Sequence, residues 1–152
     1  EGTKGMLHGG LLYLYAQALV GALDSDGVRV DPQGNIGPSW LGETSRKAFE
    51  QRTFGCLPNS GNIFPEIPAM EVAYASFKRQ HQRNDSQLSE ELTEEKVFFI
   101  TACMITCAMT PADNVYGGDC NKAVMNFAPF AEAFQCAPGS NMNPERKCTF
   151  FD

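Results

Sequence analysis

The sequence predicts a mainly α-helical, compact module that disulfide bonds stabilise. Three observations support this prediction. Apolar residues recur at helical spacing in several long stretches, whereas no segment gives a firm strand pattern. The 152-residue chain is 43% hydrophobic and 20% charged, which suits a single globular domain over residues 1–152 with a core of its own. The cysteines form an even set, which favours pairing: Cys56, Cys103, Cys107, Cys120, Cys136 and Cys148.

The first expected helix covers residues 11–23, where only Gln17 and Gly21 are not clearly apolar. This stretch is too short to cross a bilayer, which needs about 20 residues. A secretory signal peptide with Lys4 as its charged region is the competing interpretation, but two tyrosines and a glutamine interrupt the apolar run. Because a helix that is apolar on nearly every face belongs inside a core, we expect a central buried helix.

A loop and a second helix are expected next. Residues 24–37 are rich in Gly, Asp and Pro, so they predict a loop with room for a short hairpin. Residues 38–53 predict an amphipathic helix, with Trp40, Ser45 and Phe49 on part of its inner side.

The third expected helix follows an irregular stretch. Pro65 and Pro68 delay its start until about Pro68, a residue that suits the first turn of a helix. The helix is expected to continue to about residue 83. Its inward-facing residues are expected to be Met70, Ala73, Tyr74 and Phe77.

A strong start signal precedes the helix expected over residues 93–109. Thr93 is a good N-cap, and Glu94 and Glu95 lie in the first turn, at the positive end of the helix dipole. The acidic run around them therefore has a structural interpretation, which we prefer to a catalytic one. The remaining segments are expected to be a loop, a short helix and an irregular tail, over residues 110–124, 125–136 and 137–152.

Charge and cysteine content limit the classes of function. The net charge is −6 and no basic cluster exceeds the short "FKRQHQR", so we expect neither nucleic acid nor an anionic membrane as a partner. The one N-glycosylation sequon, at Asn84, has a polar, loop-like setting that a glycan could reach. Three disulfides in an oxidising compartment fit six cysteines. A zinc site is the alternative, but Cys103 and Cys107 are four residues apart in a helical stretch, whereas structural zinc sites favour shorter spacing on a turn.

Three segments carry a family resemblance: "FAEAFQCAPGSNMNPERKC", "LTEEKVFFITACMITCAM" and "GVRVDPQGNIGPSWLGETSRKAFEQRTFGC". The first resembles the closing pattern of the neprilysin and endothelin-converting-enzyme family of zinc metallopeptidases. The second resembles the family's helix before its last loop, and the third resembles the segment after its catalytic helix. "TFFD" stands where that family ends in tryptophan. The resemblance covers about residues 7–148. It implies a module like the C-terminal part of the family's catalytic domain, with no counterpart to the family's N-terminal roof domain.

The family's His-Glu-x-x-His motif falls on "GGLLYLYAQALVG". In that motif two histidines one helical turn apart bind zinc and the glutamate activates a water molecule. The resemblance places the histidines at Gln17 and Gly21 and the glutamate at Ala18. A neutral glutamine is a poor zinc ligand, glycine has no side chain, and alanine cannot take a proton. The resemblance therefore implies a vestigial site that holds no metal and no other cofactor.

The family's remaining site positions also carry unsuitable residues. The third zinc ligand, a glutamate, matches Asn62, and the aspartate that orients the site matches Glu66. The transition-state histidine matches Asn114 approximately. The two histidines of the chain, His8 and His81, match none of these positions and are expected on the surface or in loops.

The resemblance also implies a pairing of cysteines. The family links the equivalents of Cys56 and Cys148, and it ties the equivalents of Cys107 and Cys136 to an N-terminal region. Cys103 and Cys120 are extra and are expected to supply replacement partners. Cys103 and Cys107 are too poorly placed on one helix to bond to each other. Two pairings stay open: Cys103–Cys120 with Cys107–Cys136, or Cys103–Cys136 with Cys107–Cys120. We favour the second because the loop from 107 to 120 is short and closes readily.

The sequence therefore predicts a secreted, catalytically inactive, metallopeptidase-like protein that serves as a binding or structural component, as in venoms or saliva. A protein or peptide partner is expected. The alternative is an interaction subunit that forms a homo- or hetero-oligomer through the surface that a roof domain would cover. An enzyme of another type is the third hypothesis, but no Gly-x-Ser-x-Gly motif, phosphate-binding glycine loop or oriented Cys/His pair supports it.

Overall fold

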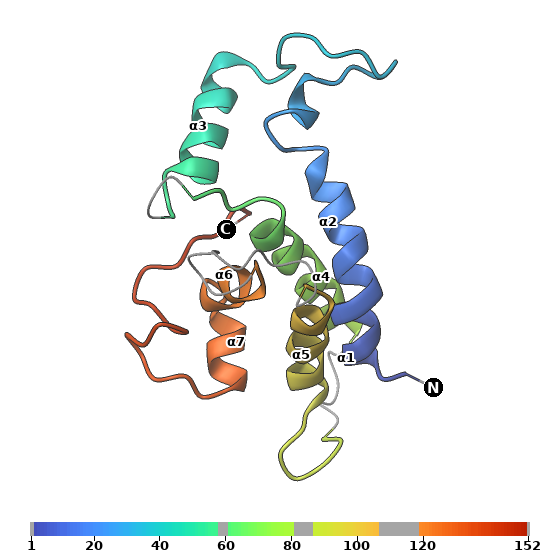
Figure 1. The fold of residues 1–152 in the computed structure, drawn as a ribbon, viewed down its shortest axis with the longest axis vertical. Coiled ribbons are helices and arrows are strands. Elements are labelled where there is room, and N and C mark those ends of the chain that lie inside the picture. Colours follow the sequence, from blue (N-terminus) through green and yellow to red (C-terminus); the bar gives the residue numbers. More distant parts are fainter. Residues whose placement is uncertain (1, 58–60, 81–86, 107–118, 152) are drawn as a thin grey trace.

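The computed structural model describes residues 2–57, 61–80, 87–106 and 119–151. This part of the chain is helical, and its only β pairing is two isolated antiparallel bridges, Val30–Ile36 and Gln87–Thr93. Figure 1 shows the arrangement of the helices. In chain order they are α1 (Lys4–Leu7), the π-helical η1 (His8–Leu12), α2 (Tyr13–Gly21), the short 3₁₀ turn η2 (Gly27–Arg29), α3 (Glu43–Phe54), α4 (Glu66–Gln80), α5 (Glu94–Thr106), α6 (Asp119–Met125) and α7 (Ala128–Ala133).

The first three elements form one helical rod from Lys4 to Gly21. The side chain of Thr3 caps its start by accepting a hydrogen bond from the backbone N–H of Met6 at 3.2 Å. The rod lies against α5 at two of its glycines. A Cβ at Gly5 or at Gly9 would overlap the backbone of α5. Glycine therefore lets the two helix backbones approach closely.

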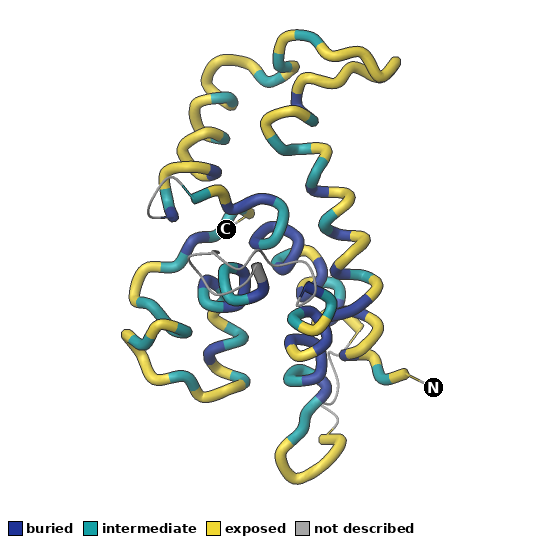
Figure 2. Tube along the Cα trace, in the orientation of Figure 1, coloured by how far each residue is buried: buried dark blue, intermediate teal, exposed yellow. Residues whose placement is uncertain are grey.

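The expectation of a central buried helix over residues 11–23 is wrong. Tyr13, Ala16 and Val20 are buried, but the other side of the rod faces solvent, and Leu11 is 66% exposed. Figure 2 shows exposed segments recurring along this rod, at the right of the view. The rod forms one wall of the domain, since only its inner side packs on α4 and α5.

The core lies between the rod, α4 and α5. The predicted inward face of α4 is confirmed, since Met70, Ala73, Tyr74 and Phe77 are all buried. Phe98 and Phe99 of α5 are fully buried beside them. Ring centroids of Tyr74 lie 5.5 Å from Phe98 and 5.6 Å from Phe99, so aromatic contacts join the two helices.

The structural interpretation of the acidic start of α5 is confirmed. The hydroxyl of Thr93 accepts a hydrogen bond from the backbone N–H of Lys96 at 3.2 Å, as an N-cap does. The Glu94 carboxylate is buried and accepts a hydrogen bond from the N–H of Gly5 at 2.6 Å. The Glu95 carboxylate accepts a hydrogen bond from the Tyr74 hydroxyl. These carboxylates fix α5 against α1 and α4.

The segment with α3 extends away from the core, at the top of Figure 1. The predicted helix over residues 38–53 starts later, at Glu43. Trp40 precedes it and is 55% exposed, and Ser45 is also exposed, so neither lies on an inner side. Phe49 is half-buried and packs on Phe64 and Phe150, which joins α3 to the body of the domain.

Two further expectations for the C-terminal part are corrected. The loop expected over residues 110–124 contains all of α6 except Met125, and of the helix expected over 125–136 the structure forms α7, which is shorter. Asn126 marks the break, where its Oδ1 accepts the N–H of Cys148 at 2.9 Å and its Nδ2 donates to the carbonyl of Lys122 at 2.8 Å. The tail after α7 is irregular, as predicted.

The disulfides confirm one expectation and overturn another. Cys56 and Cys148 are bonded, with their Cα atoms 5.7 Å apart. Cys103 is bonded to Cys120, so the favoured Cys103–Cys136 pairing is wrong. The physical reason is that α6 begins before Cys120 and packs its first turn on α5, whereas Cys136 follows α7 and has no disulfide partner among the described residues. Cys107 lies outside the described part of the chain.

Candidate functional site

The positions that the resemblance assigns to the zinc motif lie on α2. Gln17 and Gly21 are half-buried and Ala18 is exposed. Tyr13 lies one turn before Gln17, and its hydroxyl donates a hydrogen bond to the carbonyl of Glu66 at 3.3 Å. This contact brings α2 beside the start of α4. Of the three assigned positions, Gln17 offers a neutral amide, Ala18 a methyl group and Gly21 no side chain.

An ion pair joins the start of α4 to α6. Lys122 Nζ lies 2.6 Å from Glu66 Oε2, and the two side chains are only 12% and 13% exposed. Asn62, before α4, is exposed and accepts a hydrogen bond from the N–H of Phe64 at 2.8 Å, so its side chain stabilises a turn. The charge of the Glu66 carboxylate is thus balanced by an ammonium group of the same chain.

Of the two histidines, His8 lies within the described residues, and it is a core residue. His8 is fully buried, so the expectation of a surface position is wrong for it. Its Nδ1 donates a hydrogen bond to the carbonyl of Lys4 at 2.9 Å, and its ring packs edge-on against Phe77 with centroids 5.8 Å apart. The wide π-helical turn of η1 carries this ring into the core. His81, Asn84 and Asn114 lie outside the described residues.

The donor set does not fit a zinc ion. Across residues 2–57, 61–80, 87–106 and 119–151, His, Cys, Asp and Glu side chains nowhere gather in threes within reach of one metal. Catalytic zinc sites use three protein ligands drawn from these residue types. At the α2–α4 junction the carboxylate of Glu66 is already paired with Lys122, whose positive charge would repel a divalent cation.

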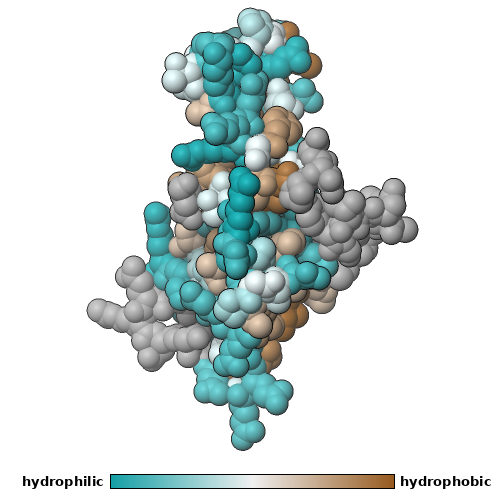
Figure 3. Space-filling view, turned by 90° about the vertical axis from the view of Figure 1, so that its left-hand side faces the viewer, coloured by the Kyte–Doolittle hydropathy of each residue, from teal (hydrophilic) through white to brown (hydrophobic). Residues whose placement is uncertain are grey.

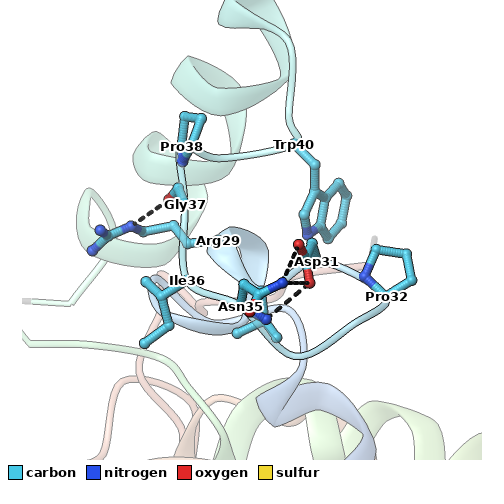
Figure 4. A pocket seen from close by; sticks show the side chains of 9 residues that line it. Arg29, Asp31, Pro32, Asn35, Ile36, Gly37, Pro38 and Trp40 are labelled. Atoms are coloured by element: carbon cyan, nitrogen blue, oxygen red, sulfur yellow. Dashed lines mark hydrogen bonds between the residues drawn. The ribbon is translucent and has the colours of Figure 1, made fainter.

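A pocket that the sequence interpretation missed lies on the hairpin between α2 and α3. It has a volume of about 680 Å³, and Figure 4 shows the side chains around it. Hydrogen bonds from the side chain and backbone of Asn35 hold the pKa of the Asp31 carboxyl below its usual value. Arg29 Nε donates a hydrogen bond to the carbonyl of Gly37 at 3.1 Å. The sequence signal for this pocket was Trp40, the one tryptophan of the chain, which lies close to prolines.

An exposed apolar surface runs along the outer side of the rod. We call it the rod face, and define it as Leu7, Leu11, Leu14, Tyr15 and Leu19. Residues 5–23 include no Asp, Glu, Lys or Arg. By contrast, the side of the molecule drawn in Figure 3, with α3 at its top, is mostly hydrophilic. The most apolar exposed helix in the described part of the chain is therefore also the one that carries Gln17 and Gly21.

Comparison with known proteins gives one family. The model of "Peptidase family M13" matches residues 59–150. Endothelin-converting enzyme 1 of Bos taurus is 24% identical over 170 residues, which cover 92% of this chain and 22% of that protein. Neprilysin-1 of Caenorhabditis elegans is 27% identical over 179 residues, with 95% and 24% covered. Neprilysin-3 of Drosophila melanogaster is 23% identical over 175 residues, with 95% and 22% covered. The chain therefore spans less than a quarter of the length of these relatives.

Proposed function

The chain belongs to peptidase family M13, and from this premise we propose that it is a non-catalytic member of the family that acts by binding another macromolecule. The observation that carries the proposal is the make-up of the α2–α4 junction. Gln17, Ala18 and Gly21 stand where the resemblance puts the two zinc ligands and the base. The ammonium group of Lys122 neutralises the carboxylate of Glu66, which the resemblance matches to the aspartate that orients the site.

Metal-assisted peptide hydrolysis needs groups that these residues do not offer. Three ligands fix the zinc ion, and a carboxylate takes a proton from the attacking water. The amide of Gln17 is a weak donor to zinc, Ala18 has only a methyl group, and Gly21 has none. These properties support a scaffold that has kept the family's helices without its chemistry.

We further propose that the protein is secreted. Two disulfides favour an oxidising compartment, because reducing compartments rarely sustain structural disulfides. The Asn84 sequon is compatible with glycosylation on that route. No helix within the described part of the chain has both the length and the apolar character that a membrane crossing requires.

The second candidate function is that of an interaction subunit, which pairs with a separate chain or with itself. The rod face favours it. Side chains such as Leu11 and Tyr15 are 66% and 60% exposed, and apolar residues gathered in this way mark interaction surfaces. Both candidate functions involve binding to another macromolecule. They differ in whether the protein and its partner form a stable complex.

The experiment measures zinc content and peptide cleavage on one purified sample. We expect no stoichiometric zinc after exposure to excess zinc and removal of the free metal, and no turnover of a fluorogenic peptide mixture. An active M13 peptidase in the same buffers is the positive control. The variant Gln17→His, Ala18→Glu, Gly21→His should also stay inactive, because Asn62 and Lys122 are unchanged. Chelator-sensitive turnover by the unmodified chain would overturn the proposal.

A further inference from the structure

A hollow rich in basic residues lies where the end of α3 meets the C-terminal tail (Figure 1). We call it the basic hollow. It has a volume of about 530 Å³ and is lined by Ala48, Gln51, Arg52, Gly55, Cys56, Arg146, Lys147 and Thr149. Three of these eight residues are cations and none is acidic. In a chain with 18 acidic and 12 basic residues, this lining is a local reversal of charge.

The two walls of the basic hollow are fixed to each other. The Cys56–Cys148 disulfide joins the end of α3 to the tail, with the Cα atoms 5.7 Å apart. Arg52 Nη1 donates a hydrogen bond to the carbonyl of Phe150 at 2.6 Å across the same junction. The hollow is therefore preformed, and a ligand would order little of the chain on binding.

The three cations have hydrogen-bond donors to spare. A guanidinium and an ammonium each carry several N–H donors. Arg52 uses one on the tail, and Lys147 Nζ donates one to the carbonyl of Met125 at 3.2 Å. Among the ion pairs of the described residues, none includes Arg52, Arg146 or Lys147. The lining thus offers positive charge that no carboxylate of the described chain balances.

Arg52 and Lys147 also have structural roles, and Arg146 is the cation that such roles do not explain. Arg52 lies in the last turn of α3, where its charge meets the negative end of the helix dipole. Burial lowers the pKa of the Lys147 ammonium below its usual value, because the group has lost part of its water. An anion in the hollow would favour the charged form of Lys147 and would give the exposed Arg146 a partner.

The chemistry of the lining selects a phosphate group. The planar fork of an arginine matches the oxygens of a phosphate, and a lysine adds a point charge. A phosphate monoester carries a charge of about −1.5 to −2 near pH 7, so three cations suit it better than they suit a single carboxylate. The volume falls in the range of small-molecule sites, about 300–1,000 Å³, which leaves room for the organic part of an ester. The net charge of −6 opposes long polyanions, so binding depends on these local contacts.

We propose that the basic hollow binds the phosphate group of a phosphate monoester, with Arg146 in contact with its oxygens and Arg52 and Lys147 beside it. The phosphate has two sources, a free small molecule or a phosphorylated side chain of this or another polypeptide, and both use the same contacts. The inference goes beyond the proposed function, because it assigns a ligand class to a site that zinc chemistry does not involve.

The test is isothermal titration calorimetry at low ionic strength, with β-glycerophosphate and a short phosphoserine peptide as probes. β-Glycerophosphate should bind with a dissociation constant below about 1 mM, and added sodium chloride should weaken the binding. Arg146→Gln should weaken it by about tenfold or more, since it removes a charge-assisted hydrogen bond. Arg79→Gln is the matched control, because it removes the same charge from an exposed position of α4 that does not line the hollow. It should bind like wild type.

The two probes separate the sources of the phosphate. Binding of β-glycerophosphate at least as tight as that of the peptide indicates a free small molecule, and tighter binding of the peptide indicates a phosphorylated side chain. No binding of either probe at about 10 mM, or an Arg146→Gln variant that binds like wild type, would overturn the inference. Urea unfolding should give the same midpoint for both variants, because the replaced side chains are exposed. Zinc-dependent turnover by the unmodified chain would overturn the proposed function and leave the phosphate site untouched.

Discussion

Removing the Cys56–Cys148 disulfide is expected to cost more stability than removing Cys103–Cys120, by about 1.5 kcal/mol. The two bonds join cysteines that are 92 and 17 residues apart in the sequence. In the chain-entropy model, loops of these lengths correspond to about 4.6 and about 3.1 kcal/mol at 25 °C. The longer loop restricts the unfolded chain more, so breaking it favours the unfolded state more.

The folded tail has contacts that keep it in place without the bond. Asn126 Oδ1 accepts the N–H of Cys148, and Arg52 donates a hydrogen bond to the carbonyl of Phe150 at 2.6 Å. The Glu71 carboxylate accepts the N–H of Phe150 at 3.0 Å. Because these interactions survive the substitution of both cysteines, the difference between the two disulfides should reflect the unfolded chain.

The measurement is urea unfolding, followed by circular dichroism, of Cys56→Ala with Cys148→Ala and of Cys103→Ala with Cys120→Ala. The free energies of unfolding should fall in the order wild type, the Cys103/Cys120 variant, the Cys56/Cys148 variant. Ser45→Ala, at an exposed position of α3, is the control and should lie within about 0.5 kcal/mol of wild type. A Cys103/Cys120 variant that is as unstable as the Cys56/Cys148 variant would refute the loop-length reasoning.

Three further predictions concern the helices. Gly9→Ala should lower the free energy of unfolding by about 3 kcal/mol, because its Cβ would overlap the α5 backbone. Gly21→Ala, with open space around it, should change the free energy of unfolding by less than about 1 kcal/mol. Equal thermal midpoints for the two variants would contradict this prediction. Lys122→Met should lower the free energy of unfolding by about 3 kcal/mol, because it leaves the buried Glu66 carboxylate without its cation. Adding Glu66→Gln should recover part of this loss. An unchanged urea midpoint for Lys122→Met would mean that the ion pair contributes nothing. Leu14→Ala should cost under about 1.5 kcal/mol in the monomer, since Leu14 is 42% exposed, and a loss above about 3 kcal/mol would indicate that it is buried.

The two central helices could be predicted because local signals and packing agree there. In α4, the residues spaced for one face are the buried ones, from Met70 to Phe77. In α5, the hydroxyl of Thr93 caps the first turn, and the acids that follow it satisfy donors on other helices. Local propensity and tertiary structure favour the same helix at these positions, so periodicity alone was sufficient.

The rod could not be predicted in the same way. Its residues are apolar on nearly every side, and such a pattern does not say which side meets the core. The side is decided by Gly5 and Gly9, where the absence of Cβ atoms lets α5 approach. Two glycines four residues apart at the start of an apolar run were the available signal, since they permit close helix packing.

The α6 helix and the ion pair depend on partners far away in the sequence. Residues 119–125 lack a strong helical pattern of their own, and α6 gains its place from the Cys103–Cys120 disulfide and from the Lys122–Glu66 pair. The absence of a His-Glu-x-x-His motif could be read directly from the sequence. The identity of the cation beside Glu66 could not, because no local pattern relates residue 122 to residue 66.

The rod carries both the positions that the resemblance assigns to the zinc motif and the exposed apolar side chains of the rod face. Its inner side is specified by packing, since glycines and Tyr13 face neighbouring helices. Core packing does not specify the outer side of the rod. Leu11, for example, is 66% exposed, so replacing it with a polar residue would leave the core unchanged. Polar residues at those positions would also keep an acidic protein more soluble. Neither the stability nor the solubility of the monomer requires five large apolar side chains on that stripe, and this supports the binding role proposed above.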